Sequence, residues 1–187
     1  MPILGIIASS FRSAGGGPEG AYDALATVTV GSTALSSVTF SGIPTGYKHL
    51  QLRYVSRGSI SATFTNVNVR FNGDTGNNYI THWLDGNGTS ASGENSGTTS
   101  LIYLGVGTGA NANASVFGAG VFDFLDYAST NKNKTCRALA GEDNNGSGFL
   151  GLISGLWVNT SAVTTIDIFP NSGTFSQYSQ FALYGIK

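Results

Sequence analysis

The sequence predicts an all-β fold, a jelly-roll-type β-sandwich of about ten short antiparallel strands preceded by an extended N-terminal arm. First, apolar and polar residues alternate along Lys48–Tyr54 and again along Asn66–Asn72. A period of two is typical of a half-buried strand, because successive side chains point to opposite faces. Second, Gly/Asn/Ser turns separate short apolar runs throughout the chain. Third, no segment of ten or more residues has a helical period, so the strands favour a sandwich.

The strands of the first half are expected in pairs. Residues 24–30 and 36–40 flank a short connection that is typical of a hairpin, and residues 48–56 and 62–72 follow as a second pair. A further strand is expected at residues 78–84. Residues 85–97 are rich in Gly, Ser and Asn and are interpreted as a long polar loop, a kind of segment that often carries function.

The second half continues the same alternation of strand and turn. Val116–Phe124 is apolar on both faces, which predicts a central strand covered from both sides. Gly118 and Gly120 on this strand indicate a bulge or a close approach of another element. The remaining strands are expected at residues 101–106, 134–140, 148–158, 163–169 and 179–186.

The N-terminal residues 1–20 are interpreted as an anchoring arm and linker, and residues 21–187 as a single β-sandwich domain. The arm has a Gly-rich stretch before the domain and an apolar run at its start. Exposed apolar side chains are unfavourable in water, so this run either folds back on its own domain or docks into a partner. The Gly-rich spacer favours docking, and the anchoring residues would be Ile3, Leu4, Ile6, Ile7 and Phe11.

The low charge of the chain narrows its function. Charged residues make up 10% of the sequence, against roughly 25% in ordinary domains, and the formal net charge is −1. Nine Lys and Arg residues do not form a basic face, so nucleic-acid binding is rejected. Weak charge repulsion favours a homo-oligomer. No run approaches the ~20 apolar residues that span a bilayer, so membrane insertion is not expected. The apolar N-terminal run lacks the basic residues that begin a signal peptide, so synthesis in the cytoplasm is expected.

No pattern of catalytic residues stands out, so the chain is not expected to be an enzyme and no cofactor or metal is expected. His49 and His82 lie outside any known catalytic motif, and each is interpreted as structural or on the surface. The lone Cys136 is expected to be buried on a strand. Paired carboxylates for glycoside hydrolysis and loop oxygens for calcium remain as alternatives that no spacing favours.

Carbohydrate binding is the ligand class that the sequence can support. Such sites combine an aromatic platform with amide and carboxylate groups. Trp83 stands next to the polar segment that contains Asp85 and Asn87, and Trp157 stands next to a second polar turn. These four residues are therefore candidate glycan contacts, with core packing as the alternative for each Trp.

Several segments resemble a family of virion structural proteins of tailed bacteriophages, notably marine and cyanobacterial ones, that are described as tail-fibre-like. The resemblance covers residues 22–187, and the N-terminal residues 1–10 also resemble the starts of such proteins. It is carried by five segments: Ala26–Val30, Ser37–Pro44, Tyr47–Arg53, Val69–Tyr79 and Phe181–Ile186.

The resemblance implies a β-sandwich of jelly-roll type, a homotrimer, and attachment to the virion through the N-terminal arm. The virion would be its location, after assembly in the host cytoplasm, and other virion proteins of the tail, baseplate or capsid would be its partners. Two roles are implied: a tail-associated fibre or receptor-binding domain that contacts a host cell-surface glycan, and a capsid decoration or cement protein that clamps coat subunits. We favour the tail-associated role. A depolymerase would need a carboxylate pair that the sequence does not identify.

Overall fold

The computed structural model describes residues 20–187, and the predicted arm residues Ile3, Leu4, Ile6, Ile7 and Phe11 lie outside this range. The described part of the chain is all-β, as predicted, with twelve strands. The strands are β1 (Tyr22–Thr29), β2 (Val38–Ser41), β3 (His49–Ser56), β4 (Phe64–Phe71), β5 (Tyr79–Gly86), β6 (Ala91–Thr99), β7 (Ile102–Thr108), β8 (Gly118–Leu125), β9 (Lys134–Asp143), β10 (Gly148–Trp157), β11 (Thr165–Pro170) and β12 (Gln180–Ile186).

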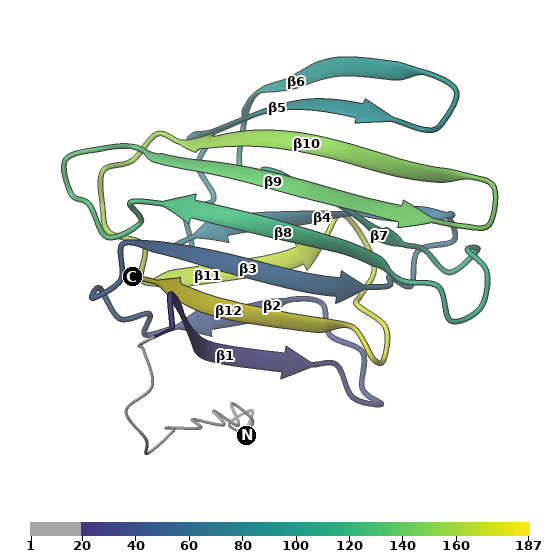
Figure 1. Cartoon of the computed structure of the whole chain (residues 1–187), viewed down its shortest axis with the longest axis horizontal. Helices are drawn as coiled ribbons and strands as arrows, with labels where there is room; N and C mark the ends of the chain where they lie inside the picture. The colour runs from purple at the N-terminus through teal and green to yellow at the C-terminus, as the bar shows by residue number, and fades with distance from the viewer. Residues whose placement is uncertain (1–19) are drawn as a thin grey trace.

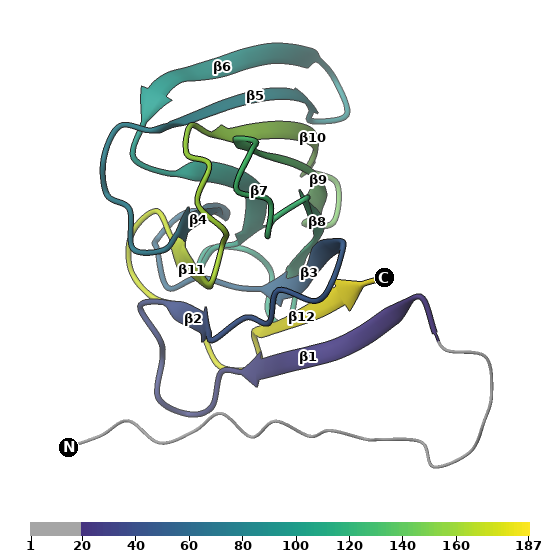
Figure 2. The same cartoon turned by 90° about the vertical axis from the view of Figure 1, so that its left-hand side faces the viewer.

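The strands form two antiparallel sheets that face each other (Figures 1 and 2). The large sheet has eight strands in the order β1-β12-β3-β8-β9-β10-β5-β6, and the small sheet has four in the order β2-β11-β4-β7. In Figure 2 the large sheet curves around the small one. The predicted β-sandwich is therefore confirmed.

The strand pairing has the topology of a jelly roll. Going inward from the two chain ends, β1 pairs with β12, β2 with β11, β3 with β8, and β4 with β7. These eight strands form the folded-over double ribbon that defines the fold. Two hairpins are inserted into it, β5–β6 between β4 and β7, and β9–β10 between β8 and β11. Both hairpins join the same edge of the large sheet, which they lengthen beyond the small sheet.

The core lies between the two sheets and is rich in aromatic rings. Phe71 from the small sheet packs against Phe124 and Trp157 from the large sheet, with ring centroids 5.3 and 5.5 Å apart. Phe122 and Phe181 on the large sheet are also fully buried. Aromatic side chains bury large apolar areas, so this cluster supplies much of the stability of the sandwich.

The two hairpins expected in the first half are wrong, although their strands exist. Strand β1 lies in the large sheet and β2 in the small sheet, and β3 and β4 are divided in the same way. In a jelly roll these connections cross from one sheet to the other, so strands that are adjacent in sequence do not pair. Alternation of side chains reveals a strand but does not reveal its partner.

Two further expectations need correction. The predicted loop at residues 85–97 is largely the end of β5 and most of β6, joined by a short turn. Strand β8 is central in the large sheet, but only one of its faces is buried. Val121 and Asp123 lie on the other face and are half-buried. The close approach expected at Gly120 is present, because a Cβ there would lie 2.5 Å from the ring of Tyr54.

Candidate functional site

The β5–β6 hairpin extends past β7, the edge strand of the small sheet (Figure 2). A cleft lies between the hairpin and the small sheet. We call this the overhang cleft, and its volume is about 330 Å³. One wall consists of inward-facing side chains of β5 and β6, and the other of side chains on the outer face of the small sheet. Its lining includes Asn66, Asn68, Thr81, Trp83, Asp85, Glu94, Ser96, Leu101, Tyr103, Phe149 and Asn171.

The aromatic part of the overhang cleft is a pair of rings from different sheets. Trp83 on β5 packs edge-to-face against Tyr103 on β7, with centroids 5.5 Å apart and planes at 66°. Both side chains are half-buried. Burial, and secondarily the nearby Asp85 carboxylate, raise the pKa of the Tyr103 hydroxyl. This hydroxyl therefore stays protonated and can donate a hydrogen bond at neutral pH.

The polar part of the overhang cleft combines amides with carboxylates. Asn68 is only 2% exposed, and its Nδ2 has no hydrogen-bond partner in the described chain. An unpaired buried donor is costly and rare, which marks this amide as a group that a ligand or water can satisfy. Asp85 accepts a hydrogen bond of 3.2 Å from the Ser92 hydroxyl. With Glu94 the cleft holds two carboxylates, and its described lining contains no Lys or Arg.

The four predicted glycan contacts lie in different parts of the structure. Trp83 and Asp85 lie together in the overhang cleft. Asn87 lies in the β5–β6 turn, where its Oδ1 accepts hydrogen bonds from the backbone N–H groups of Thr89 and Ser90 at 3.0 and 2.9 Å. Trp157 is 1% exposed in the core, so the assignment of this residue to a glycan contact is wrong.

Sequence reasoning missed the residues that come from other strands. The sequence pattern assigns Glu94 to a loop, and Tyr103 and Asn68 only to strands. Asn68 alternates with the buried Val67 and Val69, which indicates a position on the outer face of the sheet. The β5–β6 hairpin covers that face. The alternation along β4 does not reveal which other strands lie over it.

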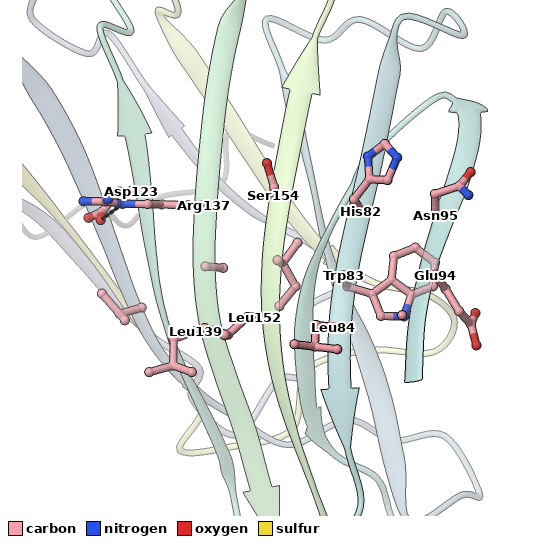
Figure 3. A pocket seen from close by; sticks show the side chains of 14 residues that line it. His82, Trp83, Leu84, Glu94, Asn95, Asp123, Arg137, Leu139, Leu152 and Ser154 are labelled. Carbon is pink, nitrogen blue, oxygen red and sulfur yellow. Dashed lines mark hydrogen bonds and ion pairs between the residues drawn. The ribbon is translucent and has the colours of Figure 1, made fainter. Parts of the chain in front are cut away.

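A second candidate surface is the outer face of the large sheet, which no other described element covers (Figure 1), and Figure 3 shows the side chains that line its depression. The strand register aligns its side chains in rows across the strands. A shallow depression of about 700 Å³ lies over two of these rows. We call them the polar row, formed by Asp123, Arg137, Ser154 and His82, and the leucine row, formed by Val121, Leu139, Leu152 and Leu84.

The polar row is held in place by contacts with its neighbours. Arg137 Nε donates to Asp123 Oδ2 at 3.1 Å, and Gln51 Nε2 donates to Asp123 Oδ1 at 2.8 Å. Gln51 in turn accepts a 2.7 Å hydrogen bond from Arg53 Nε. The Arg53 guanidinium lies over the ring of Tyr184, 4.9 Å from its centroid. The charges of this row are thus paired within the sheet.

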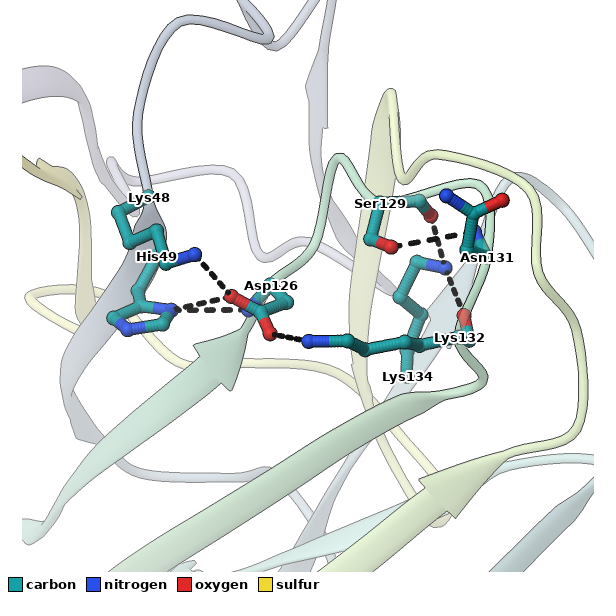
Figure 4. A network of polar contacts seen from close by, with 7 residues as sticks. All are labelled: Lys48, His49, Asp126, Ser129, Asn131, Lys132 and Lys134. Carbon is teal, nitrogen blue, oxygen red and sulfur yellow. Dashed lines mark hydrogen bonds and ion pairs between the residues drawn. The ribbon is translucent and has the colours of Figure 1, made fainter.

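The turn after β8 contains the densest group of charges, and its geometry indicates a structural role (Figure 4). Asp126 lies 3.2 Å from Lys48 Nζ and 2.6 Å from Lys132 Nζ. Hydrogen bonds from Lys132 and Lys48 lower the pKa of Asp126 to about 2. His49 Nδ1 accepts a 3.0 Å hydrogen bond from the Asp126 backbone N–H, so this ring holds the turn. Buried Lys134 donates to three backbone carbonyls of the surrounding loops.

Neither Cys136 nor His82 belongs to a group of potential metal ligands within residues 20–187. Cys136 is buried, as predicted, and its burial raises the pKa of the thiol, which keeps it protonated. His82 is exposed on the outer face. Within residues 20–187, no three His, Cys, Asp or Glu side chains gather as ligands for a metal ion. The same residues include no helix long and apolar enough to cross a bilayer.

Comparison with known proteins gives no relatives: no family model, curated protein or solved structure matches the chain.

Proposed function

We propose that this chain is a bacteriophage virion structural protein, a tail-associated receptor-binding β-sandwich that recognises a host-surface saccharide in the overhang cleft. The observation that supports saccharide recognition is the cleft itself, where Trp83 and Tyr103 lie beside two carboxylates and an unpaired amide donor. The virion location and the attachment through the arm rest on the family resemblance. Other virion proteins would receive the arm.

The cleft has the chemistry that a sugar ring requires. Apolar C–H faces of a sugar pack on aromatic rings, while amides and carboxylates bond its hydroxyl groups. Trp83 and Tyr103 supply the rings, and Asp85 supplies acceptor oxygens. Asn68 lines the cleft, and its buried Nδ2 is a donor that the described chain leaves unpaired. A volume of about 330 Å³ is at the lower end of ligand pockets, which favours a short saccharide unit.

The charge of the cleft selects among saccharides. Asp85 and Glu94 repel sialic acids, uronic acids and phosphorylated sugars, and no described cation in the lining offsets that repulsion. Neutral hexoses and amino sugars are the favoured class, because an amino group would be attracted by either carboxylate.

Binding by defined variants tests this proposal. Trp83→Ala should weaken binding of neutral or amino sugars found on a glycan array by tenfold or more, which corresponds to about 1.4 kcal/mol. Glu94→Gln should weaken amino sugars more than neutral ones. Asp143→Asn removes an exposed carboxylate outside the cleft and is the matched control. Equal binding by Trp83→Ala and the unmodified protein, measured by calorimetry, would count against the cleft.

The alternative role, which the family resemblance also implies, is a capsid decoration protein whose arm and β-sandwich domain clamp neighbouring coat subunits. Imaging of virions labelled with a gold-tagged antibody separates the two roles. Label at the tail supports the receptor-binding role. Label distributed over the head supports decoration and contradicts the tail-associated role.

A further inference from the structure

We propose that the outer face of the large sheet pairs with the same face of a second copy of this chain. The twofold axis would run parallel to the strands, midway between β9 and β10. The interface lies on the outer face of the large sheet, whereas the overhang cleft lies on the inward-facing side of β5 and β6; Trp83 and Glu94 line both the cleft and the outer depression.

The apolar area on this face is contiguous. Leu152 on β10 lies directly between Leu139 on β9 and Leu84 on β5 in the strand register. Leu139, Leu84 and Leu152 are 45%, 55% and 56% exposed, and Leu150 on the same face is 61% exposed. Single exposed leucines are ordinary, but a contiguous group of this kind marks an interaction surface.

The proposed axis makes the leucine row self-complementary. The rotation places β9 over the partner's β10 and β8 over the partner's β5. Each row then faces the same row of the partner. Leu139 then meets the partner's Leu152, and Val121 meets the partner's Leu84. In the next row Leu150 meets the partner's Gly141, which has no side chain. The leucine of one copy therefore packs over a glycine of the other, beside which the partner's own Leu150 side chain lies.

The same rotation gives the polar row compatible partners. Asp123 meets the partner's His82, and Arg137 meets the partner's Ser154. One strand further out, the amide of Gln51 meets the amide of the partner's Asn95. No directly facing pair has two charges of the same sign, and each Arg137 beside the axis is paired with Asp123 of its own sheet, which limits the repulsion between the two guanidinium groups.

The available area matches what a stable dimer needs. From β3 to β6 the large sheet has six strands, spaced about 4.8 Å apart, and strands of eight residues are about 26 Å long. The footprint is therefore roughly 750 Å², close to the ≈800 Å² per partner of a standard interface. Because each sheet is twisted, the two faces diverge with distance from the axis, so contact is tightest at the central leucines.

Light scattering coupled to gel filtration of the full chain tests the stoichiometry. The unmodified protein should run as two copies, and Leu152→Gln should run as one copy with an unchanged circular dichroism spectrum. Phe64→Gln removes an exposed apolar side chain of the small sheet and should remain a dimer. A monomeric unmodified protein would overturn the proposal, and so would the homotrimer that the family resemblance implies.

Cross-linking tests the axis. Val121→Cys and Leu84→Cys proteins, whose positions face each other across the axis but lie three strands apart within one sheet, are purified separately, mixed, and treated with a mild oxidant, which takes two electrons and two protons from a pair of thiols to form one disulfide. In the mixture, up to half of the chains should become disulfide-linked dimers, because only dimers that contain one chain of each variant bring the two thiols together. Each variant alone should remain uncross-linked, because buried Cys136 is inaccessible. A cross-link in either variant alone, or none in the mixture, would overturn this pairing.

Discussion

The Trp157 indole shows how one polar contact can complete an apolar core. Its Nε1 donates a 2.8 Å hydrogen bond to Asp74 Oδ2 in the turn after β4. The same carboxylate accepts hydrogen bonds from the Asn78 side chain at 2.9 Å and from the Gly76 backbone N–H at 2.8 Å. The bonds from Trp157 and Asn78, with a smaller contribution from Gly76, lower the pKa of Asp74. Asp74 therefore links the turn to the core while it is ionised.

We predict that Asp74→Ala lowers the free energy of unfolding at neutral pH by about 1–3 kcal/mol, because the buried indole N–H loses its acceptor. A carboxyl group whose pKa is lowered by folding contributes stability above its unfolded pKa, near 4, and loses that contribution as the pH falls through its folded pKa. The difference between the variant and the unmodified protein should therefore shrink below pH 4. Urea unfolding followed by tryptophan fluorescence at pH 7 and pH 3 measures it. A difference that persists unchanged at pH 3 would contradict this account.

At the residue scale, the sequence could predict that two of the four candidate residues, Trp83 and Asp85, share one face. Trp83 and Asp85 alternate on one strand and so point to the same face, which is a local property. Trp157 has the same local surroundings, an apolar strand followed by a polar turn. Its side chain points to the buried face, whereas the exposed Leu150 and Leu152 point to the other. Both faces of β10 are apolar, so the pattern does not reveal which face is the core.

At the element scale, the backbone path of β7 depends on Gly105. Gly105 has a φ of 124°, a backbone conformation that L-residues rarely adopt. A Cβ at this position would lie 2.2 Å from the Cβ of Ala140 on β9 and 3.1 Å from the Tyr54 hydroxyl. The pairing of β4 with β7 shifts register at this place, between Val67 and Asn68. The irregularity allows β7 to approach the large sheet closely.

We predict that Gly105→Ala destabilises the protein by about 3 kcal/mol or more, since backbone strain and overpacking each cost roughly 1–3 kcal/mol. Gly46→Ala is the control, because its added Cβ meets nothing within 4 Å. The control should change stability by less than about 0.5 kcal/mol. Denaturant titration of both variants compares them, and a Gly105→Ala protein as stable as the control would show that β7 can relax.

The elements themselves were more predictable than their partners. Eleven of the twelve strands coincide with apolar runs in the sequence, because burial on one face imposes alternation. The exception is β6, whose sequence Ala91–Thr99 is almost entirely exposed and polar, so it has no apolar face to detect. Pairing between strands far apart in the chain, such as β1 with β12, depends on the fold of the whole domain.

At the scale of the whole molecule, the two inserted hairpins carry both candidate surfaces. The β5–β6 hairpin forms the roof of the overhang cleft, and its strand β5 together with β9 and β10 presents the three central leucines of the outer face. The eight jelly-roll strands form the support, and the additions to one edge provide the surfaces for recognition. Function on a common fold is often located in such additions.

The final prediction concerns the arm and the domain together. We expect that removing residues 2–12 leaves the domain folded, because β1 begins at Tyr22 and its register with β12 is complete from that residue. The melting temperature should stay within about 2 °C of that of the full chain, since no core contact of the described domain is removed. The same deletion should abolish incorporation into virions, as measured by immunoblotting of purified particles. Replacing Ile3 and Ile6 with Ser keeps the length of the arm and should reduce incorporation as well, because the anchor is proposed to act through its apolar side chains. Loss of folding on deletion, or normal incorporation without the arm, would contradict the anchoring role.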